Sequence, residues 1–164
     1  MDGFQRELID LLPRLRRFAR SLTGHVADAD DLVQLSVERA LERRAQWRPG
    51  TRLDSWMFRI MKNGWIDETR ARSRKPGISA SEDAVERVAD PAAPDLDARL
   101  QVSAVARAMA GLPPDQREAV ALVLVEELSY REAADVLDIP IGTLTSRLVR
   151  GRQALQAELA GSHG

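Results

Sequence analysis

The sequence predicts an all-helical (all-α) fold, built as two small helical domains joined by a flexible linker. Apolar residues recur at the three-to-four-residue spacing of helices in two separate stretches, and no stretch shows the alternation of β-branched residues that strands require. Between them the chain is rich in Pro, Gly, Ala, Ser and acidic residues, a composition typical of linkers. We expect domains over residues 1–74 and 96–164, and a linker over 75–95 with a short helix at 82–88.

The first domain should open with two helices. An apolar stripe from Phe4 to Leu22 predicts the first, and Pro13 predicts a kink or a fresh helix start within it. The Thr-Gly pair at 23–24 should end this helix. The second helix should begin near the acids of 28–31, which suit the positive end of a helix dipole, and continue to about residue 46.

A loop and a third helix should complete this domain. The residues Trp-Arg-Pro-Gly at 47–50 predict the loop by their turn chemistry. The third helix is expected from about residue 53 to about residue 72. Its core face should consist of Trp56, Met57, Ile60 and Met61.

The second domain contains the strongest motif in the chain, two short helices joined by a tight turn. Ser129 and Glu132 form a Ser-x-x-Glu capping box, so the first of these helices should begin directly after the serine. Pro140 should end it, because the residue before a proline is pushed out of the α region. Gly142 should permit the turn, and Gly142 or Thr143 should cap the next helix.

The second helix of the motif is amphipathic and basic. Leu144, Leu148 and Leu155 should line its buried face. Residues 142–157 include three arginines and no acid. This layout is that of a helix-turn-helix, whose second helix enters the major groove of duplex DNA. The opposite face presents Thr145, Ser146, Val149 and Arg150.

Charge is divided unevenly along the chain, although the formal net charge is only −1. Residues 1–75 carry 16 Lys+Arg against 11 Asp+Glu, an excess of +5, whereas residues 76–111 and 112–164 each carry −3. The positive residues gather in two patches, one on the helix after residue 142 and one over 56–75. A nearly neutral total is therefore compatible with a nucleic-acid ligand.

The patch over 56–75 mixes aromatic residues with six positive ones. Cations supply affinity for phosphates, and aromatic rings offer surfaces on which unstacked bases can lie. The same residues also fit an ordinary structure, with Trp56, Phe58 and Trp65 in a core and 70–75 as a solvated helix end. Residue types alone leave these two interpretations at equal weight.

Other function classes find little support in the sequence. The chain has no cysteine, which excludes disulfides and thiolate metal sites, and no apolar run approaches the twenty or so residues that span a bilayer. The first residues lack the pattern of an export signal, so we expect a cytoplasmic protein without membrane insertion. Asp28, Asp30 and Asp31 lack further oxygen ligands at a spacing that would complete a metal shell. His25 and His163 are isolated, so we expect no metal, no cofactor and no enzymatic activity.

The ordered set of motifs resembles the extracytoplasmic-function (ECF) sigma factors of bacterial RNA polymerase. The matching stretches cover both domains in the family's order, namely 28–34 (Asp-Ala-Asp-Asp-Leu-Val-Gln), 56–63 (Trp-Met-Phe-Arg-Ile-Met-Lys-Asn) with Ile66-Asp67 and Arg70, and 112–155. The resemblance implies a sigma region 2 type three-helix unit followed by a region 4 type helix-turn-helix unit. It implies an alternative sigma factor for a stress or environmental response. The implied partners are promoter DNA, core RNA polymerase through its clamp and flap, and an inhibitory anti-sigma factor.

By this resemblance, the first domain binds the polymerase clamp and holds the promoter's −10 element as a single strand. The clamp contact is assigned to Asp31, Gln34, Leu35 and Glu38. Asn63 and the loop 47–52 match the family's pocket for a flipped base, and an amide offers both donors and acceptors to a base edge. The residues assigned to the −10 strand are Trp47, Arg59, Lys62, Asn63 and Arg70.

The resemblance also implies that the second domain reads the −35 element as duplex DNA. Base edges and thymine methyls are assigned to Thr145, Ser146 and Val149. The phosphate contacts are assigned to Thr143, Arg147, Arg150 and Arg152. Two positions depart from the family pattern. Leu35 stands where an acid is usual, which alters the expected clamp contact, and position 145 lacks an arginine, so no strong guanine contact is expected there.

Two other interpretations remain open. A stand-alone helix-turn-helix regulator would use the same C-terminal motif, but it would need a ligand pocket or a dimer seam in the first domain, where no long heptad run occurs. A protein-interaction module would use the apolar stripes to bind a partner. The shift in composition at Lys75 suggests a hinge that lets the two units close on an inhibitor and open on the polymerase.

Overall fold

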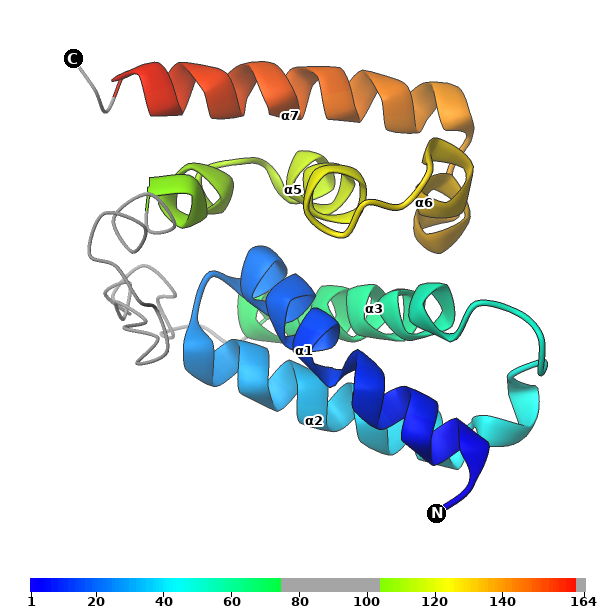
Figure 1. Cartoon of the computed structure of the whole chain (residues 1–164). Helices are drawn as coiled ribbons and strands as arrows, with labels where there is room; N and C mark the ends of the chain where they lie inside the picture. Colours follow the sequence, from blue (N-terminus) through cyan, green and yellow to red (C-terminus); the bar gives the residue numbers. More distant parts are fainter. Residues whose placement is uncertain (75–103, 162–164) are drawn as a thin grey trace, which may run out of the picture.

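The computed structural model describes residues 1–74 and 104–161, and every regular element in these ranges is helical (Figure 1). The N-terminal unit contains α1 (Gly3–Thr23), α2 (Val26–Glu42), the short 3-10 helix η1 (Arg44–Gln46) and α3 (Leu53–Ser73). The C-terminal unit contains a helical segment at 104–110, α5 (Pro114–Val120), the π-helical turn η3 (Ala121–Val125), α6 (Tyr130–Leu137) and α7 (Ile141–Gly161). The all-helical fold class is confirmed, whereas the predicted linker at 75–95 and the short helix at 82–88 lie outside the described residues.

Helix α1 has well-defined ends. At its start the Asp2 carboxylate accepts a hydrogen bond from the Gln5 backbone N–H, and the Gln5 side chain accepts one from the Asp2 N–H. At its end Gly24 adopts a left-handed φ of 73°, which glycine reaches without steric cost. Pro13 lies inside the helix, and the chain continues through it without a fresh start.

The core of the N-terminal unit forms where α1, α2 and α3 meet. The rings of Phe18 and Phe58 pack with their centroids 4.7 Å apart, and both side chains are fully buried. Met57, Ile60 and Met61 are buried as predicted. Trp56 is only half-buried, so the prediction that it belongs to the core face is partly wrong, because Phe58 takes the central position.

An ion pair ties the start of α2 to the end of α3. The Asp28 carboxylate accepts hydrogen bonds of 3.0 and 2.7 Å from the Arg72 guanidinium, which lower the pKa of Asp28. The pair therefore stabilises the fold above about pH 4 and loses its contribution as the pH falls through the lowered folded-state pKa. We expect Asp28→Asn to reduce the unfolding temperature at neutral pH by a margin that shrinks on acidification. Thermal unfolding across this pH range would measure the effect, and a margin independent of pH would contradict it.

The helix-turn-helix is present, with one correction at its turn. The capping box is confirmed, since the Ser129 hydroxyl accepts from the Glu132 N–H and the Glu132 side chain accepts from the Ser129 N–H. The predicted role of Gly142 in the turn is wrong. The turn is made by Asp138, which ends α6 with a left-handed φ of 55°, and α7 already begins at Ile141. Gly142 and Thr143 thus lie in the first turn of α7 and do not cap it.

The two units pack directly against each other (Figure 1). Their buried apolar side chains form one continuous cluster. Helix α1 lies against α5 and η3, and α3 lies against α6. Arg117 on α5 reaches across this boundary, because its Nη1 donates to the Leu22 carbonyl of α1 at 2.9 Å while its other nitrogens donate to carbonyls of its own unit. Burial lowers the pKa of Arg117. The described chain is therefore in a closed arrangement.

Candidate nucleic-acid and polymerase interface

One face of α7 is free of protein contacts that would bury it. Leu144 and Leu148 are buried against the rest of the unit as predicted, while Val149 is 49% exposed. Ser146, Arg150 and Arg152 are also exposed, whereas Thr143, Thr145 and Arg147 are half-buried. The predicted outward face is therefore confirmed for Ser146, Val149 and Arg150, whereas Thr145, predicted on the same face, is half-buried.

The hydroxyl groups on this face are already oriented by the helix. Thr145 Oγ1 donates to the Ile141 carbonyl at 2.9 Å, and Ser146 Oγ donates to the Gly142 carbonyl at 3.1 Å. With their protons engaged, these oxygens present only lone pairs, which suits base-edge donors such as exocyclic amino groups. Arg147 differs from the other arginines of α7 because its Nε lies 3.7 Å from the Asp115 carboxylate of α5.

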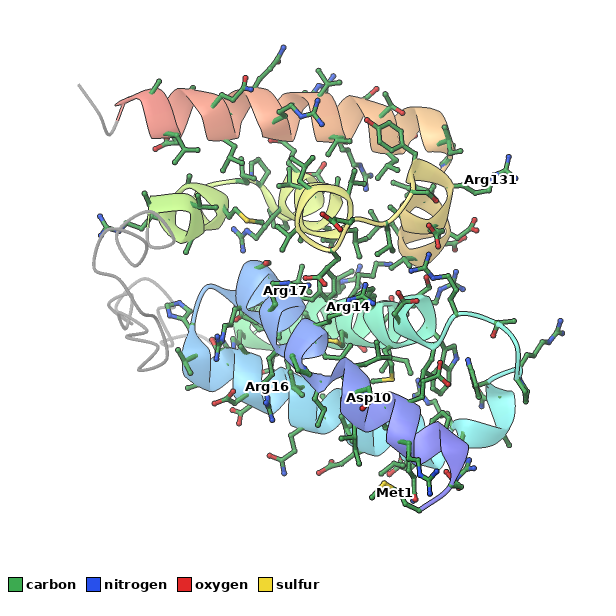
Figure 2. The ribbon with its side chains drawn as sticks, viewed as in Figure 1. Met1, Asp10, Arg14, Arg16, Arg17 and Arg131 are labelled. Atoms are coloured by element: carbon green, nitrogen blue, oxygen red, sulfur yellow. The ribbon has the colours of Figure 1, made fainter. Side chains whose placement is uncertain are left out.

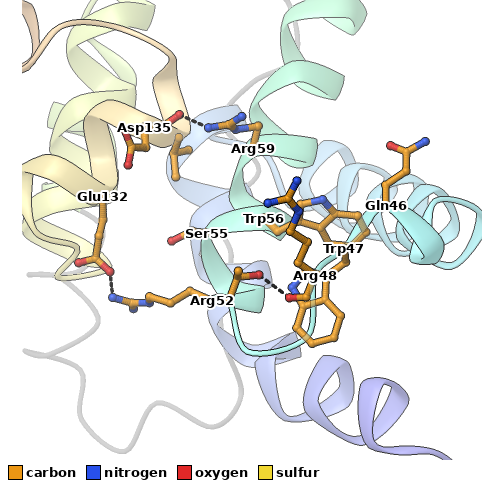
Figure 3. Close-up of a pocket in the computed structure, with 11 residues that line it drawn as sticks. Gln46, Trp47, Arg48, Arg52, Ser55, Trp56, Arg59, Glu132 and Asp135 are labelled. Carbon is orange, nitrogen blue, oxygen red and sulfur yellow. Dashed lines mark hydrogen bonds and ion pairs between the residues drawn. The ribbon is translucent and has the colours of Figure 1, made fainter.

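A hollow lies beside the loop that precedes α3, and we call it the loop hollow (Figure 3). Two buried polar atoms in its lining, Trp47 Nε1 and Ser55 Oγ, have no hydrogen-bond partner within the described structure. Unpaired buried polar atoms are costly, so a change in this loop that exposed or paired them would be favourable. The lining residues are Gln46, Trp47, Arg48, Thr51, Arg52, Ser55, Trp56 and Arg59 from the N-terminal unit, and Glu132, Asp135 and Val136 from α6.

The loop hollow contains only part of the set predicted for the −10 strand. Trp47 and Arg59 line it, whereas Asn63 does not and is exposed further along α3. Arg52 lies at the end of the predicted pocket loop 47–52, but no separate role was predicted for it, and Ser55, which follows shortly after that loop, was missed. The lining position of Trp56 was not predicted, because helical periodicity assigned this residue to the core face of the third helix.

The remaining predicted residues extend the same face of α3. Trp56, Arg59, Asn63 and Arg70 are spaced at three, four and seven residues, so their side chains project from one side of the helix. Lys62 lies beside this face and is half-buried. Its charge acts on Glu118 of α5, where burial raises the carboxyl pKa despite the opposing effects of Lys62 and Arg147.

A second hollow lies between α1 and α2. Asp31, Gln34 and Glu38 are exposed on α2, Leu35 is half-buried, and Gln34 Nε2 lies 3.5 Å from Glu38 Oε1. Gln34 and Glu38 line the hollow, but Asp31 and Leu35 do not. The contribution of α1 was missed, because its arginines look like an ordinary solvated face in the sequence. The lining residues are Leu12, Arg16, Arg20, Asp30, Val33, Gln34, Val37 and Glu38.

The described ranges contain neither a candidate metal site nor a candidate membrane-spanning helix. Residues 1–74 and 104–161 contain no group of three or more His, Cys, Asp or Glu side chains arranged to hold a metal ion. None of the helices in these ranges combines the length and the apolar character needed to cross a bilayer.

Comparisons with known proteins agree with the two-unit organisation. The sigma2 domain of PhyR matches residues 8–62, and sigma-70 region 4 matches residues 103–155. The ECF RNA polymerase sigma factor EcfG of Rhodopseudomonas palustris is 36% identical over 158 residues, which cover 96% of this chain and 86% of that protein. The ECF RNA polymerase sigma factor SigE of Mycolicibacterium smegmatis is 37% identical over 150 residues, covering 90% of this chain and 58% of that protein.

A solved structure shows the same arrangement of helices. The sigma factor RpoE from Bartonella quintana, crystallised in complex with the anti-sigma factor NepR, superposes with a TM-score of 0.84 and 32% sequence identity, over 98% of both chains. The identity, the coverage and the order of the two units together establish the family. This chain belongs to the ECF sigma factors of RNA polymerase.

Proposed function

We propose that this chain recruits core RNA polymerase to a specific set of promoters as an alternative sigma factor and carries no chemistry of its own. The observation that supports this most directly is the pairing of two surfaces in one chain. The exposed face of α7 suits duplex DNA, and the loop hollow with the adjoining face of α3 suits an unpaired strand. Sigma factors are regulatory proteins, and we place this one in the cytoplasm, where the polymerase acts.

The single-strand role is supported by the chemistry of the loop hollow. Extracting a base from the stack costs a few kcal/mol, so its pocket must supply compensating contacts. Trp47 and Trp56 offer rings for stacking, and Arg52 and Arg59 offer cations for the backbone. Trp47 Nε1 and Ser55 Oγ are buried without a hydrogen-bond partner, and they could pair with a base or phosphate oxygen only after the loop moves to expose them. We assign Lys62, Asn63 and Arg70 to the continuation of the strand along α3.

The polymerase contact is assigned to the hollow between α1 and α2. Exposed carboxylates on α2 and arginines on α1 surround the apolar side chains of Leu12, Val33 and Val37 there. An apolar centre with a charged rim is the usual make-up of a protein interface. We assign the clamp to this surface, including Asp31, Gln34, Leu35 and Glu38, and the flap to the C-terminal unit.

We propose an anti-sigma factor as the inhibitory partner. RpoE of Bartonella quintana was solved in complex with the anti-sigma factor NepR, and its fold matches this chain over nearly its whole length. Promoter-dependent transcription with added core polymerase and a random promoter library tests the assignment as a whole. Tight binding to operator duplex by the chain alone, without association with the core enzyme, would instead favour a stand-alone regulator.

The division between duplex and single-strand roles gives a separate prediction. Arg147→Ala and Arg150→Ala should weaken duplex binding at all promoters and lower the slope of log affinity against log salt by about one, because each removes a phosphate contact. Asn63→Ala should leave duplex affinity unchanged and reduce strand opening, measured by fluorescence of 2-aminopurine placed in the −10 element. Equal loss of duplex binding in all three variants would contradict these roles.

A further inference from the structure

In the closed arrangement, cations of the proposed single-strand site are bound by the chain's own C-terminal unit. Arg52 forms an ion pair with Glu132 of α6, and Arg59 donates to the Asp135 backbone carbonyl of the same helix (Figure 3). Glu132, Asp135 and Val136 also form one wall of the loop hollow. Helix α6 therefore covers the hollow and occupies two cations that a DNA backbone would otherwise contact.

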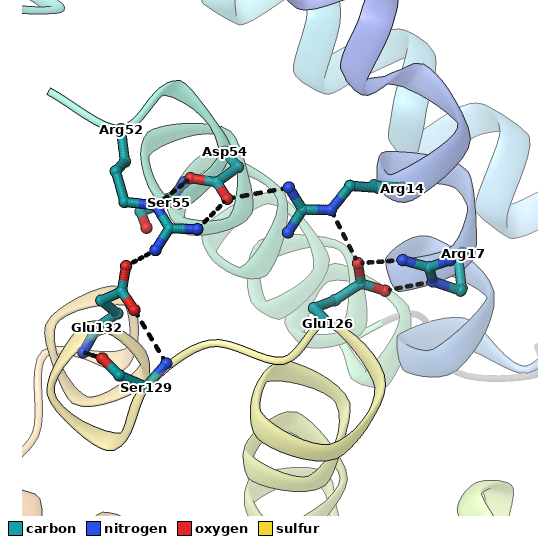
Figure 4. A network of polar contacts seen from close by, with 8 residues as sticks. All are labelled: Arg14, Arg17, Arg52, Asp54, Ser55, Glu126, Ser129 and Glu132. Atoms are coloured by element: carbon teal, nitrogen blue, oxygen red, sulfur yellow. Dashed lines mark hydrogen bonds and ion pairs between the residues drawn. The ribbon is translucent and has the colours of Figure 1, made fainter. Parts of the chain in front are cut away.

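A second set of contacts fixes α6 in this position. Glu126, in the turn that connects η3 to α6, has a side chain with 0% exposure. Its carboxylate accepts hydrogen bonds of 2.9 Å from Arg17 Nε and 2.9 Å from Arg17 Nη2, and lies 3.5 Å from Arg14 Nε (Figure 4). Both arginines come from α1, on the side that faces the C-terminal unit (Figure 2). The hydrogen bonds to Glu126 raise the pKa of Arg17.

The two sets of contacts are linked through one carboxylate of the N-terminal unit. Asp54 at the start of α3 accepts from Arg14 at 3.0 Å and from Arg52 at 2.6 Å. Burial by itself would raise the pKa of Asp54, but hydrogen bonds from Arg52, the Ser55 N–H and Arg14 outweigh it and lower the pKa. Arginines and carboxylates thus alternate in one network that runs from Arg17 through Glu126 to Glu132, and three of its contacts join the two units.

The buried position of Glu126 makes it the sensitive point of this network. A carboxylate removed from water is tolerated only when charged partners bind it, and here both partners belong to the other unit. Its arginines are 31% and 53% exposed, so they remain hydrated if the carboxylate is neutralised. Changing Glu126 should therefore release the contact between units without leaving a buried, unpaired charge.

We propose that α6 is an internal plug for the single-strand site and that Glu126, held by Arg14 and Arg17, is the latch that keeps the plug in place. The free sigma factor then inhibits itself before any anti-sigma factor binds. This inference rests on the proposed role of the loop hollow in binding the −10 strand. When α6 leaves the loop hollow, Arg52 loses the Glu132 carboxylate and Arg59 loses the Asp135 carbonyl, and DNA phosphates can take their place. Salt weakens the same charged contacts, because it screens them.

The variant Glu126→Gln tests the latch in the full chain. It keeps the shape of the side chain and removes the charge. Because the chain has no cysteine, Asp10→Cys on α1 and Gln156→Cys on α7 provide exposed dye positions for energy transfer. We expect Glu126→Gln to lower the transfer efficiency and to tighten binding of a fluorescent −10 single strand roughly 10-fold.

Glu158→Gln is the matched control. It removes the same charge from the same unit at an exposed position on α7, so it should change neither transfer nor strand affinity. Circular dichroism should show the same helix content in all three proteins. If Glu126→Gln kept the wild-type transfer efficiency and strand affinity, Glu126 would not be the latch. If the transfer efficiency fell but the strand bound no more tightly, α6 would not be a plug for the single-strand site. Failure of the proposed function would look different from failure of the latch. In that case the wild type, Glu126→Gln and Glu158→Gln would all lack promoter-specific transcription with core polymerase, whatever their transfer efficiencies.

Discussion

The double variant Gly24→Cys/Ala110→Cys is expected to lose promoter-dependent transcription when oxidised and to regain it when reduced. A Cβ atom built on Gly24 lies 3.8 Å from the Ala110 Cβ, which is the mean separation in disulfides. Gly24 belongs to the N-terminal unit and Ala110 to the C-terminal unit, so the bond would hold the two units closed. The sequence contains no other cysteine that could compete.

The expected effect is large because the crosslink is covalent. A disulfide closing a loop of this size constrains the chain by about 4 kcal/mol, enough to reduce an open population on the order of 100-fold or more. Transcription with core polymerase should fall correspondingly, since the plug and the single strand compete for one site. Energy transfer between the units would confirm that the oxidised form is closed.

The redox cycle supplies its own control. Cysteine at a left-handed φ of 73° is strained by about 1–2 kcal/mol, but the reduced and oxidised forms share this strain. Each single variant should be insensitive to oxidant as a monomer. If the oxidised double variant transcribed as fast as the reduced one, separation of the units would not be required, and the hinge suggested by the composition at Lys75 would be wrong.

Local features of this fold were predictable from the sequence because they depend on neighbouring residues. The capping box of Ser129 and Glu132 needs only side chains three positions apart, and both of its hydrogen bonds are present. The buried stripe of α7 follows from helical periodicity in the same way. The turn was mispredicted because Gly142 was preferred as the left-handed residue, whereas Asp138, which also tolerates that region, comes first in the chain.

The contacts between units were not predictable by the same means. Arg17 and Glu126 are 109 positions apart, and nothing in either local pattern relates them. Arg14 and Arg17 resemble the solvated face of an amphipathic helix, and Glu126 ends an apolar run where a chain usually returns to water. Only the packing of α1 against η3 makes Glu126 a buried group with two charged partners. For the same reason, the sequence did not indicate that α6 covers the loop hollow.

Leu148→Ala is expected to have the largest effect on stability, with Val149→Ala as its matched control. Leu148 is 1% exposed in the core beneath α7, whereas the adjacent Val149 is 49% exposed on the proposed base-reading face. Truncating a fully buried leucine costs about 2–5 kcal/mol, because apolar contact is lost and a cavity remains. For a chain of this size that lowers the unfolding temperature by roughly 5–15 °C.

The two variants should separate folding from DNA reading. Val149→Ala should change the unfolding free energy by less than about 0.5 kcal/mol, since surface substitutions rarely do more. It should nevertheless weaken −35 duplex binding selectively at promoters with a thymine opposite this side chain, because a methyl contact is lost. Leu148→Ala should weaken binding to every promoter as α7 loses its support. Thermal unfolding and duplex binding should be measured on both variants. Similar unfolding temperatures would mean that Leu148 and Val149 are equally buried, and so that α7 does not present the Val149 side to DNA.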